Sequence, residues 1–226
     1  MKLAIVVPVF NEVLALPVLI ERLASLNKTS TQDFELVFVD GGSTDATAAL
    51  IEKAGCRVIT SPKGRAWQMN AGAAQTTGDV LLFLHADTQL PKNALQAIAS
   101  GLAAGKCWGR FDVRISGKAW MLRVVARMMN WRSRLSGIAT GDQAMFMTRA
   151  AFQAVGGFPE QALMEDIEIS KRLCQLSRPA CIRSSVITSG RRWETRGVWK
   201  TIFLMWRLRW AYWWGQSPHQ LAKLYA

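Results

Sequence analysis

The chain has 226 residues, half of them hydrophobic, and carries a formal net charge of +12 from 28 basic and 16 acidic side chains. A chain of this length suits one domain, because hydrophobic cores divide only beyond roughly 250 residues. The apolar content excludes a disordered basic tail. A membrane span needs about 18 uncharged apolar residues, and the longest candidate, residues 198–214, is interrupted by Lys200, Arg207 and Arg209.

The cysteines and the start of the chain indicate the compartment. Cys56, Cys107, Cys174 and Cys181 show no CxxC pair and no histidine at metal-ligand spacing. We interpret them as reduced thiols, which are typical of cytoplasmic proteins. The apolar run that opens the chain ends at Asn11 and is shorter than most signal-peptide cores. These features predict a cytoplasmic protein.

The positive charge is concentrated in the second half of the chain. Residues 1–104 have a net charge of −1, residues 105–149 of +7, residues 150–170 of −4 and residues 171–226 of +10. Basic surfaces favour anionic partners, which include nucleic acid, anionic membranes and phosphorylated ligands. Charge alone does not choose among these three.

In chain order, the first half alternates strands with helices. Short apolar runs predict buried strands at residues 3–9, 34–39, 57–60 and 79–84. Helical patterns with turn or capping residues at their starts follow at residues 13–23, 45–54, 64–74 and 91–103. This alternation predicts an α/β fold with a Rossmann-like, mostly parallel sheet flanked by helices.

The second half is less regular. Strands are predicted at residues 108–115 and 141–147, and helices at residues 118–132, 150–155, 163–175 and 198–214. We divide the chain into one domain over residues 1–190, with residues 1–104 and 105–190 as its two halves. Residues 191–226 form a basic, Trp-rich helical extension.

Three of the predicted strands end in polar clusters. These are Asn11-Glu12, Asp40-Gly41-Gly42-Ser43 and His85-Ala86-Asp87. Ligands bind at the carboxyl ends of strands in parallel sheets, so these clusters are expected to share one rim. Asp40 and its Gly-Gly-Ser turn suit a base or sugar, or simply cap the next helix. Asp87 suits a divalent cation bridging phosphates, or a helix cap.

Two further groups have polar chemistry. Glu165 and Asp166 open a helix in an otherwise basic half, where they suit a general base or merely favour the helix dipole. Arg65, Gln68 and Asn70 suit phosphate or sugar hydroxyls, or lie on a solvated helix surface.

The order of these motifs resembles the inverting glycosyltransferases of family 2, which have the GT-A fold. The resemblance covers about residues 3–176 and rests on six ordered motifs: Pro8 to Glu12, Asp40 to Asp45, Asn70 to Gly72, Gly78 to Asp87, Gly156 to Phe158, and Glu165-Asp166 with Arg172. Several strings look more narrowly like the branch labelled arsenosugar biosynthesis glycosyltransferases. They are Gly64-Arg65-Ala66, Leu84 to Thr88, Gly141-Asp142-Gln143, Met164-Glu165-Asp166 and Arg191 to Glu194.

The resemblance implies a nucleoside diphosphate sugar as donor, most often a UDP-sugar. Glu12 and Asp40 match the positions that bind ribose and base, and Pro8 and Phe10 would line the base pocket. The donor-binding set also includes Ser43, Arg65, Asn70, Asp87, Arg191 and Arg192.

The same resemblance implies manganese or magnesium as a cofactor. Asp87 matches the last acid of the family's DxD metal motif, but His85 stands where the first acid is expected. Histidine ligates manganese but suits magnesium poorly, so His85 is either a metal ligand or a neutral pocket residue. Asp166 matches the catalytic base, with Glu165 beside it, which implies a single displacement that inverts the sugar's configuration.

Six of the ten tryptophans lie between residues 193 and 214. Trp199, Phe203, Trp206, Trp210 and Trp213 recur at helical spacing on one face. This face either packs on the protein's own core or a second subunit, or lies on an anionic membrane surface. The acceptor is accordingly a small molecule or a lipid-linked one, and the protein is cytoplasmic or peripheral on the inner membrane face.

Two rival functions fit parts of the sequence. Basic charge interleaved with aromatics suits nucleic acid, but no nucleic-acid motif is present and the acids at strand ends would repel a polyanion. A nucleotidyltransferase acting on sugar phosphates would share the α/β half, but residues 8–14 contain no Gly, Lys or Arg for a phosphate loop. We therefore expect a glycosyltransferase with no nucleic-acid partner.

Overall fold

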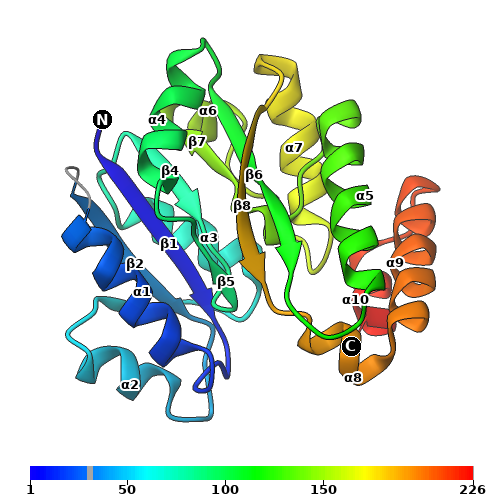
Figure 1. Cartoon of the computed structure of the whole chain (residues 1–226), viewed down its shortest axis with the longest axis horizontal. Coiled ribbons are helices and arrows are strands. Elements are labelled where there is room, and N and C mark those ends of the chain that lie inside the picture. The colour runs from blue at the N-terminus through cyan, green and yellow to red at the C-terminus, as the bar shows by residue number, and fades with distance from the viewer. Residues whose placement is uncertain (30–32, 226) are drawn as a thin grey trace.

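The computed structural model describes residues 1–29 and 33–225 (Figure 1). Within these residues, eight strands form one sheet in the order β3 (Val58–Thr60), β2 (Phe34–Asp40), β1 (Leu3–Val9), β4 (Val80–Phe83), β7 (Phe146–Thr148), β6 (Trp108–Ile115), β8 (Ala180–Thr188) and β5 (Thr88–Gln89). Strands β7 and β5 run antiparallel to their neighbours, and the other pairs are parallel. The predicted α/β fold with a mostly parallel sheet is confirmed.

Helices cover both faces of the sheet (Figure 1). They are α1 (Leu16–Thr29), α2 (Thr47–Lys53), α3 (Arg65–Ala74), α4 (Ala94–Ala103), α5 (Met121–Ser136), α6 (Arg149–Ala154), α7 (Glu165–Leu176), α8 (Arg191–Arg196), α9 (Val198–Trp213) and α10 (Pro218–Tyr225). Alternate residues of β1 feed two cores, because side chains of a strand point to opposite faces. Leu3 and Ile5 pack with α1 and α4, whereas Ala4 and Val6 pack with α3 and α7.

The predicted strand over residues 141–147 is wrong in its first half. Gly141–Gln143 form a 3-10 turn, and only Phe146–Thr148 pair as a strand. The side chain of Thr140 accepts from the Gln143 backbone while that of Gln143 accepts from Thr140, which is a reciprocal capping box. Helix α5 also ends later than predicted, because Gly137 adopts the left-handed conformation that terminates it.

The C-terminal helices pack on the domain rather than extending from it. Leu208 of α9 and Leu221 of α10 are buried together with Met164 and Ile167 at the start of α7. Val198 packs against Leu122 and Ala126 of α5. Across residues 1–29 and 33–225, every helix is too short or too polar to reach from one side of a bilayer to the other.

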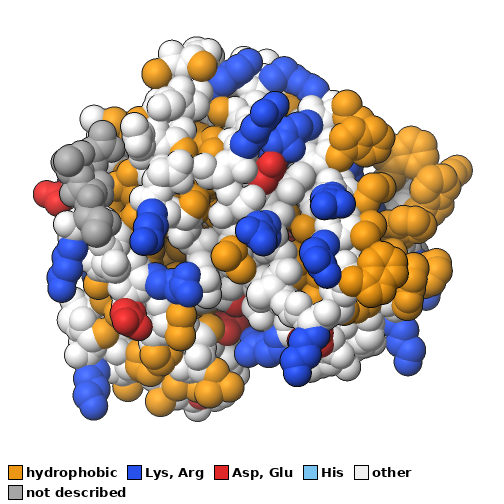
Figure 2. All heavy atoms as spheres, viewed as in Figure 1, with side chains coloured by type: hydrophobic (Ala, Val, Ile, Leu, Met, Phe, Trp, Pro, Cys, Tyr) orange, Lys and Arg blue, Asp and Glu red, His pale blue; other side chains and the backbone are white. Residues whose placement is uncertain are grey.

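The aromatic stripe of α9 faces outward, so of the three alternatives left open by the sequence, packing on the protein's own core does not hold. The five side chains of the stripe are between 60% and 73% exposed: Trp199, Phe203, Trp206, Trp210 and Trp213. The inner face of α9 is instead formed by smaller residues such as Thr201 and Leu208. Figure 2 shows hydrophobic side chains gathered at the edge where α9 lies, with Lys and Arg side chains beside them.

Candidate active site

The loops after β1 and β2 are held in place by side chains at the rim of the sheet. The carboxylate of Asp40 accepts hydrogen bonds from the backbone of Gly42 (3.1 Å) and Ser43 (3.0 Å) and from the Ser43 hydroxyl. Asn11 has a positive φ of 54°, donates its N–H to Ser43 Oγ and accepts from the Thr44 N–H. Asp40 and Ser43 therefore shape the loop that was predicted to bind the donor.

Helix α3 ties this rim to the rest of the site. The buried amide of Gln68 donates to the carbonyls of Val9 (2.7 Å) and Val39 (2.8 Å). Asn70 donates from Nδ2 to the Phe158 carbonyl and accepts at Oδ1 from the Phe158 N–H, both at 2.9 Å. Both functional groups of the Asn70 amide thus position the loop at Phe158, and donor binding by Asn70 stays a prediction.

Glu12 and Asp87 bring two acids together beside an arginine from α8. Glu12 Oε2 lies 3.6 Å from Nη2 of Arg191 and is buried without a hydrogen bond among the described residues. Burial raises the pKa of Glu12, and the charge of Asp87 raises it further, while Arg191 opposes the shift. A positive charge bound between these acids would relieve their repulsion. The structure therefore places Arg191 at the rim that holds Glu12 and Asp87.

His85 faces an acid that the sequence analysis did not select. Its Nδ1 lies 3.4 Å from Asp142 Oδ1. A Cβ at Gly141 would lie 2.4 Å from the imidazole Cε1, so only glycine allows this approach. Partial burial favours the neutral form of Asp142, but the hydrogen bond and charge of His85, with Arg65 and Arg192, hold its pKa below the ordinary value. The string Gly141-Asp142-Gln143 was the available signal for Asp142.

Glu165 and Asp166 begin α7 directly after Met164, which has a positive φ of 67°. Asp166 accepts hydrogen bonds from the backbone N–H of Gly141 (3.1 Å) and of Ile167 (2.8 Å). Glu165 is buried, and its Oε1 lies 4.0 Å from Nη1 of Arg65. Burial and the neighbouring charge of Asp166 raise the pKa of Glu165, and Arg65 opposes them.

One small pocket joins the two predicted chemical groups. It is lined by Met69, Phe83, His85, Gly141, Met145, Phe158, Glu165 and Asp166. The acid pair of α7 thus opens onto the same pocket as the polar cluster after β4. A carboxylate beside a pocket of this kind can accept a proton from a bound group.

The predicted base pocket is bounded by residues of two loops. Pro8 is buried in β1, whereas Phe10 is partly exposed at its end. Lys63 places its Nζ 3.8 Å from the centre of the Phe10 ring, a cation–π contact that the sequence analysis did not predict. Phe10 therefore presents an aromatic surface that already has a cation on one face.

The described residues include no group of three or more His, Cys, Asp or Glu side chains arranged to hold a metal. Magnesium, however, commonly uses one or two carboxylates and takes its remaining ligands from phosphates and water. The charge of Asp87 acts on Glu12, and these two carboxylates fit such a ligand set. His85 directs one ring nitrogen to Asp142 instead.

The sequence pattern of Glycosyl transferase family 2 matches residues 4–155. The chain therefore belongs to this family. Its fold is that of the GT-A glycosyltransferases, as the solved structures below show.

Relatives and solved structures extend this likeness. The chain is 35% identical over 155 residues to undecaprenyl-phosphate 4-deoxy-4-formamido-L-arabinose transferase of Yersinia enterocolitica, covering 62% of this chain and 46% of the relative. It is 26% identical to the probable glycosyltransferase YdaM of Bacillus subtilis, covering 93% and 54%. The chain thus spans about half the length of these curated relatives.

Two solved structures are similar in fold. S. aureus TarS 1–349 in complex with UDP-GlcNAc aligns with a TM-score of 0.64 at 19% identity, covering 84% of this chain and 58% of that one. The mannosyltransferase of Pyrobaculum calidifontis with GDP-Man and Mn2+ aligns with a TM-score of 0.63 at 18% identity, covering 92% and 60%. At these identities the likeness establishes the fold.

Proposed function

We propose that the chain transfers a sugar from a nucleoside diphosphate sugar, with a UDP-sugar as the first candidate, to an acceptor hydroxyl. The transfer inverts the configuration of the sugar's anomeric carbon. The observation that carries this proposal is the shared pocket of Glu165, Asp166 and His85 at the carboxyl edge of the sheet. Family membership supports it, as do the UDP-GlcNAc and GDP-Man in the similar structures. Membership also favours sugar transfer over nucleotidyl transfer or nucleic-acid binding.

The donor would lie across the carboxyl ends of β1, β2 and β4. Pro8, Phe10 and the loop held by Asp40 and Ser43 would receive the base and ribose. The diphosphate would then extend towards Asp87, where Arg191 and Arg192 provide positive charge. Burial lowers the pKa of the Arg192 guanidinium, and the charges of Arg65 and Arg196 lower it further, so a diphosphate would stabilise this cluster of cations.

Asp166 would act as the general base. The acceptor hydroxyl gives its proton to the Asp166 carboxylate as its oxygen bonds to the anomeric carbon. The bond from that carbon to the diphosphate oxygen breaks with both electrons on the leaving group, so configuration inverts. The hydrogen bond from the Gly141 N–H fixes one Asp166 oxygen, which leaves the carboxylate oriented before the acceptor arrives.

A divalent cation would neutralise charge that grows on the leaving diphosphate. We assign Asp87 as its carboxylate ligand, with Glu12 close by. We assign His85 to orienting Asp142, because its Nδ1 faces that carboxylate, although ligation of manganese by His85 was also predicted. The resemblance to the arsenosugar branch stays a prediction about the acceptor.

Binding and turnover test this function separately. Calorimetry with UDP, GDP and dTDP, with and without Mn2+, should show cation-dependent binding of one nucleotide. Hydrolysis of a panel of nucleotide sugars should then identify the donor. Asp166→Asn should bind the nucleotide with unchanged affinity but lose about 100-fold or more in turnover. Near-normal turnover of this variant, or no nucleotide binding by the wild type, would contradict the proposal.

We also propose that the α9 stripe docks on an anionic membrane surface, where a lipid-linked acceptor would be found. Its tryptophans are exposed, and Lys200 and Arg207 lie beside them on the same helix. Tryptophan favours the interface of a bilayer, and basic residues favour anionic lipid. The relative from Yersinia enterocolitica is named for undecaprenyl phosphate, which agrees with a lipid-linked acceptor.

Vesicle sedimentation tests this surface. The wild type should bind phosphatidylglycerol vesicles more tightly than phosphatidylcholine vesicles, with binding weakened by salt. Trp206→Ser with Trp210→Ser should abolish binding, whereas Val18→Ser, an exposed apolar residue of α1, should not. A different result would identify a subunit interface: the wild type does not bind vesicles and is a dimer in analytical ultracentrifugation, and the double variant is a monomer.

A further inference from the structure

Two arginines on α5 and α9 have no place in the chemistry described above. Arg132 lies on α5 and Arg209 on α9. Nε and Nη2 of Arg132 are buried, and neither makes a hydrogen bond with any residue in the described ranges. Arg209 likewise forms no hydrogen bond or ion pair with a described residue.

The charge of Asp166 acts on both guanidinium groups. Burial lowers the pKa of Arg132 to about 10, the charge of Arg209 adds to this effect, and the charge of Asp166 opposes it. Burial also lowers the pKa of Arg209, again against the charge of Asp166. The packing agrees, because Leu208 is buried against Met164 and Ile167 on either side of the acid pair. Arg209 follows Leu208 directly on α9.

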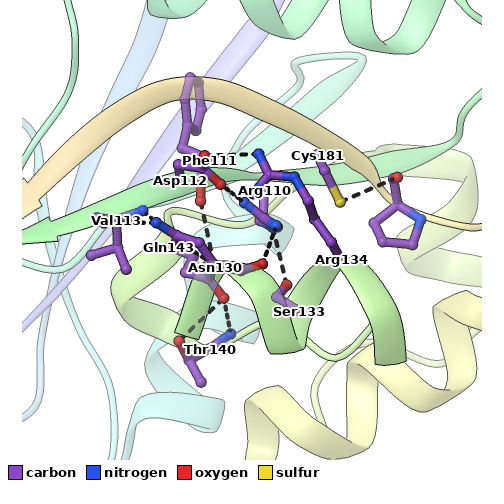
Figure 3. Close-up of polar contacts among 11 residues, drawn as sticks. Arg110, Phe111, Asp112, Val113, Asn130, Ser133, Arg134, Thr140, Gln143 and Cys181 are labelled. Carbon is purple, nitrogen blue, oxygen red and sulfur yellow. Dashed lines mark hydrogen bonds and ion pairs between the residues drawn. The ribbon is translucent and has the colours of Figure 1, made fainter. Parts of the chain in front are cut away.

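The neighbouring Arg110 shows how this fold treats an arginine that serves stability. Arg110 is fully buried, donates from Nε to Ser133 Oγ (3.0 Å) and from Nη2 to the Asn130 carbonyl (3.1 Å), and pairs with Asp112. Figure 3 shows this network between β6 and α5. Arg132 lies on the same helix as Asn130 and Ser133, but two of its nitrogens are buried without an acceptor among the described residues, which costs free energy.

Unpaired guanidinium groups that lie close together form a strong site for an oxyanion. Two like charges in a partly dry position repel each other, and a bound anion removes both that repulsion and the unsatisfied donors. The planar guanidinium group offers paired N–H donors that match phosphate oxygens. The donor's diphosphate already has Arg191 and Arg192 near Glu12 and Asp87.

We propose that Arg132 and Arg209 form a subsite for a phosphate group carried by the acceptor, which directs the acceptor's hydroxyl to Asp166. This inference rests on the proposed function, because it names the class of acceptor that the same site takes. The phosphate belongs either to a soluble phosphate ester or to a lipid phosphate.

Calorimetry on the full chain tests the subsite without turnover. Three probes carry the phosphate group: inorganic phosphate, glycerol 3-phosphate and hexyl phosphate. Tighter binding of glycerol 3-phosphate would indicate a soluble phosphate ester, and tighter binding of hexyl phosphate would indicate a lipid phosphate. Arg132→Met and Arg209→Met should each weaken binding about tenfold or more, the usual effect of losing a charged hydrogen-bonding partner. Arg127→Met, an exposed arginine of α5, should bind within about twofold of the wild type.

Two further measurements make the outcome decisive. Saturating UDP with Mn2+ should leave phosphate binding intact; loss of phosphate binding under UDP would assign the arginines to the donor and overturn the proposal. Arg132→Met should melt at or above the temperature of the ligand-free wild type, whereas marked destabilisation would show a structural role. Failure of all probes to bind, alongside normal UDP binding and turnover, would overturn this subsite and leave the proposed function standing.

Discussion

The two sides of the pocket differ in how their polar groups are satisfied. On the β1–β4 side, Asp40 and Gln68 make their hydrogen bonds within the protein and build the loops of the rim. On the side of α5 and α9, Arg132 has buried donors without partners in the described part of the chain, and aromatic side chains are exposed. Polar groups satisfied internally stabilise a preformed shape, whereas unsatisfied ones indicate a ligand. The loops on the proposed donor side are therefore preorganised, with Glu12 Oε2 as the buried atom there that lacks a hydrogen bond among the described residues, and the proposed acceptor side is completed by what it binds.

The largest expected effect distinguishes Asp87 from the loop-building acids on its own side. Asp87→Asn should lower kcat/KM by about 100-fold or more, because the cation and the leaving diphosphate lose their carboxylate ligand. Folding should change little, since within residues 1–29 and 33–225 the Asp87 side chain accepts one weak hydrogen bond, from Thr88 Oγ1 at 3.4 Å. Initial rates measured over a range of Mn2+ concentrations should show a higher cation requirement.

A matched control is Glu52→Gln on α2, which removes one exposed acid from the same half of the chain. Its rates should equal those of the wild type at every Mn2+ concentration. Equal rates for Asp87→Asn would instead mean that the cation, if one is used, is held elsewhere.

The next effect concerns stability on the acceptor side. Arg110→Met should lower the free energy of unfolding by about 3–5 kcal/mol, because Asp112 would keep a buried charge without one of its partners. Arg132→Met leaves no paired carboxylate of the described residues without its partner, so it should not show this loss. Urea denaturation of both variants measures the difference. Equal destabilisation by both substitutions would contradict the distinction between Arg110, which stabilises the fold, and Arg132, which we propose binds a ligand.

The sequence predicted the donor side well because its signals are local. Strand β1 was predicted at its observed bounds, and β2 and β4 within a residue or two, since continuous apolar runs identify strands covered on both faces. The polar residues that follow these strands share the rim because parallel strands end at one edge. The effect of the Asp87 charge on the pKa of Glu12 agrees with the expected placement of both acids on this rim, and their roles stay predictions.

The acceptor side was predicted less well because its contacts are long-range. Strand β8 was not predicted, since Arg183, Ser184 and Ser185 interrupt its apolar pattern and a register shift bends its pairing with β6. Arg132 and Arg110 are both basic residues in the sequence, and only the fold shows that one is paired. The outward direction of the α9 stripe was equally hidden, because helical spacing reveals a face but not what covers it.

Asn70 lies between the two sides of the pocket. Its substitution distinguishes an effect on stability from an effect on donor binding. Asn70→Ala should lower the free energy of unfolding by about 1–3 kcal/mol, because two backbone groups of Phe158 lose their partners. Its affinity for UDP should stay within about twofold of the wild type if its role is to hold that loop. Thermal denaturation and calorimetry on the same sample separate these results. A large loss of UDP affinity with stability retained would restore the donor-binding role that the family resemblance implies.

The smallest effect is a pH dependence at Glu165. Its pKa is raised in the folded protein by burial first and then by the charge of Asp166. Between the unfolded and folded pKa values the folded state binds more protons, so Glu165 makes the free energy of unfolding fall as pH rises. Glu165→Gln lacks the ionisable carboxyl that causes this fall. Its free energy of unfolding should therefore rise relative to that of the wild type between pH 4 and pH 7.

Urea denaturation at both pH values measures this gain, with Glu160→Gln as an exposed control near α7. A gain at Glu165 that is larger at pH 7 than at pH 4 means that the buried acid is kept at a cost to stability, as expected for a group placed for catalysis beside Asp166. The opposite sign would mean that Arg65, 4.0 Å away, outweighs burial and that Glu165 serves an ion pair. In that case the preorganised side would extend to the start of α7, and the open side would be restricted to α5 and α9.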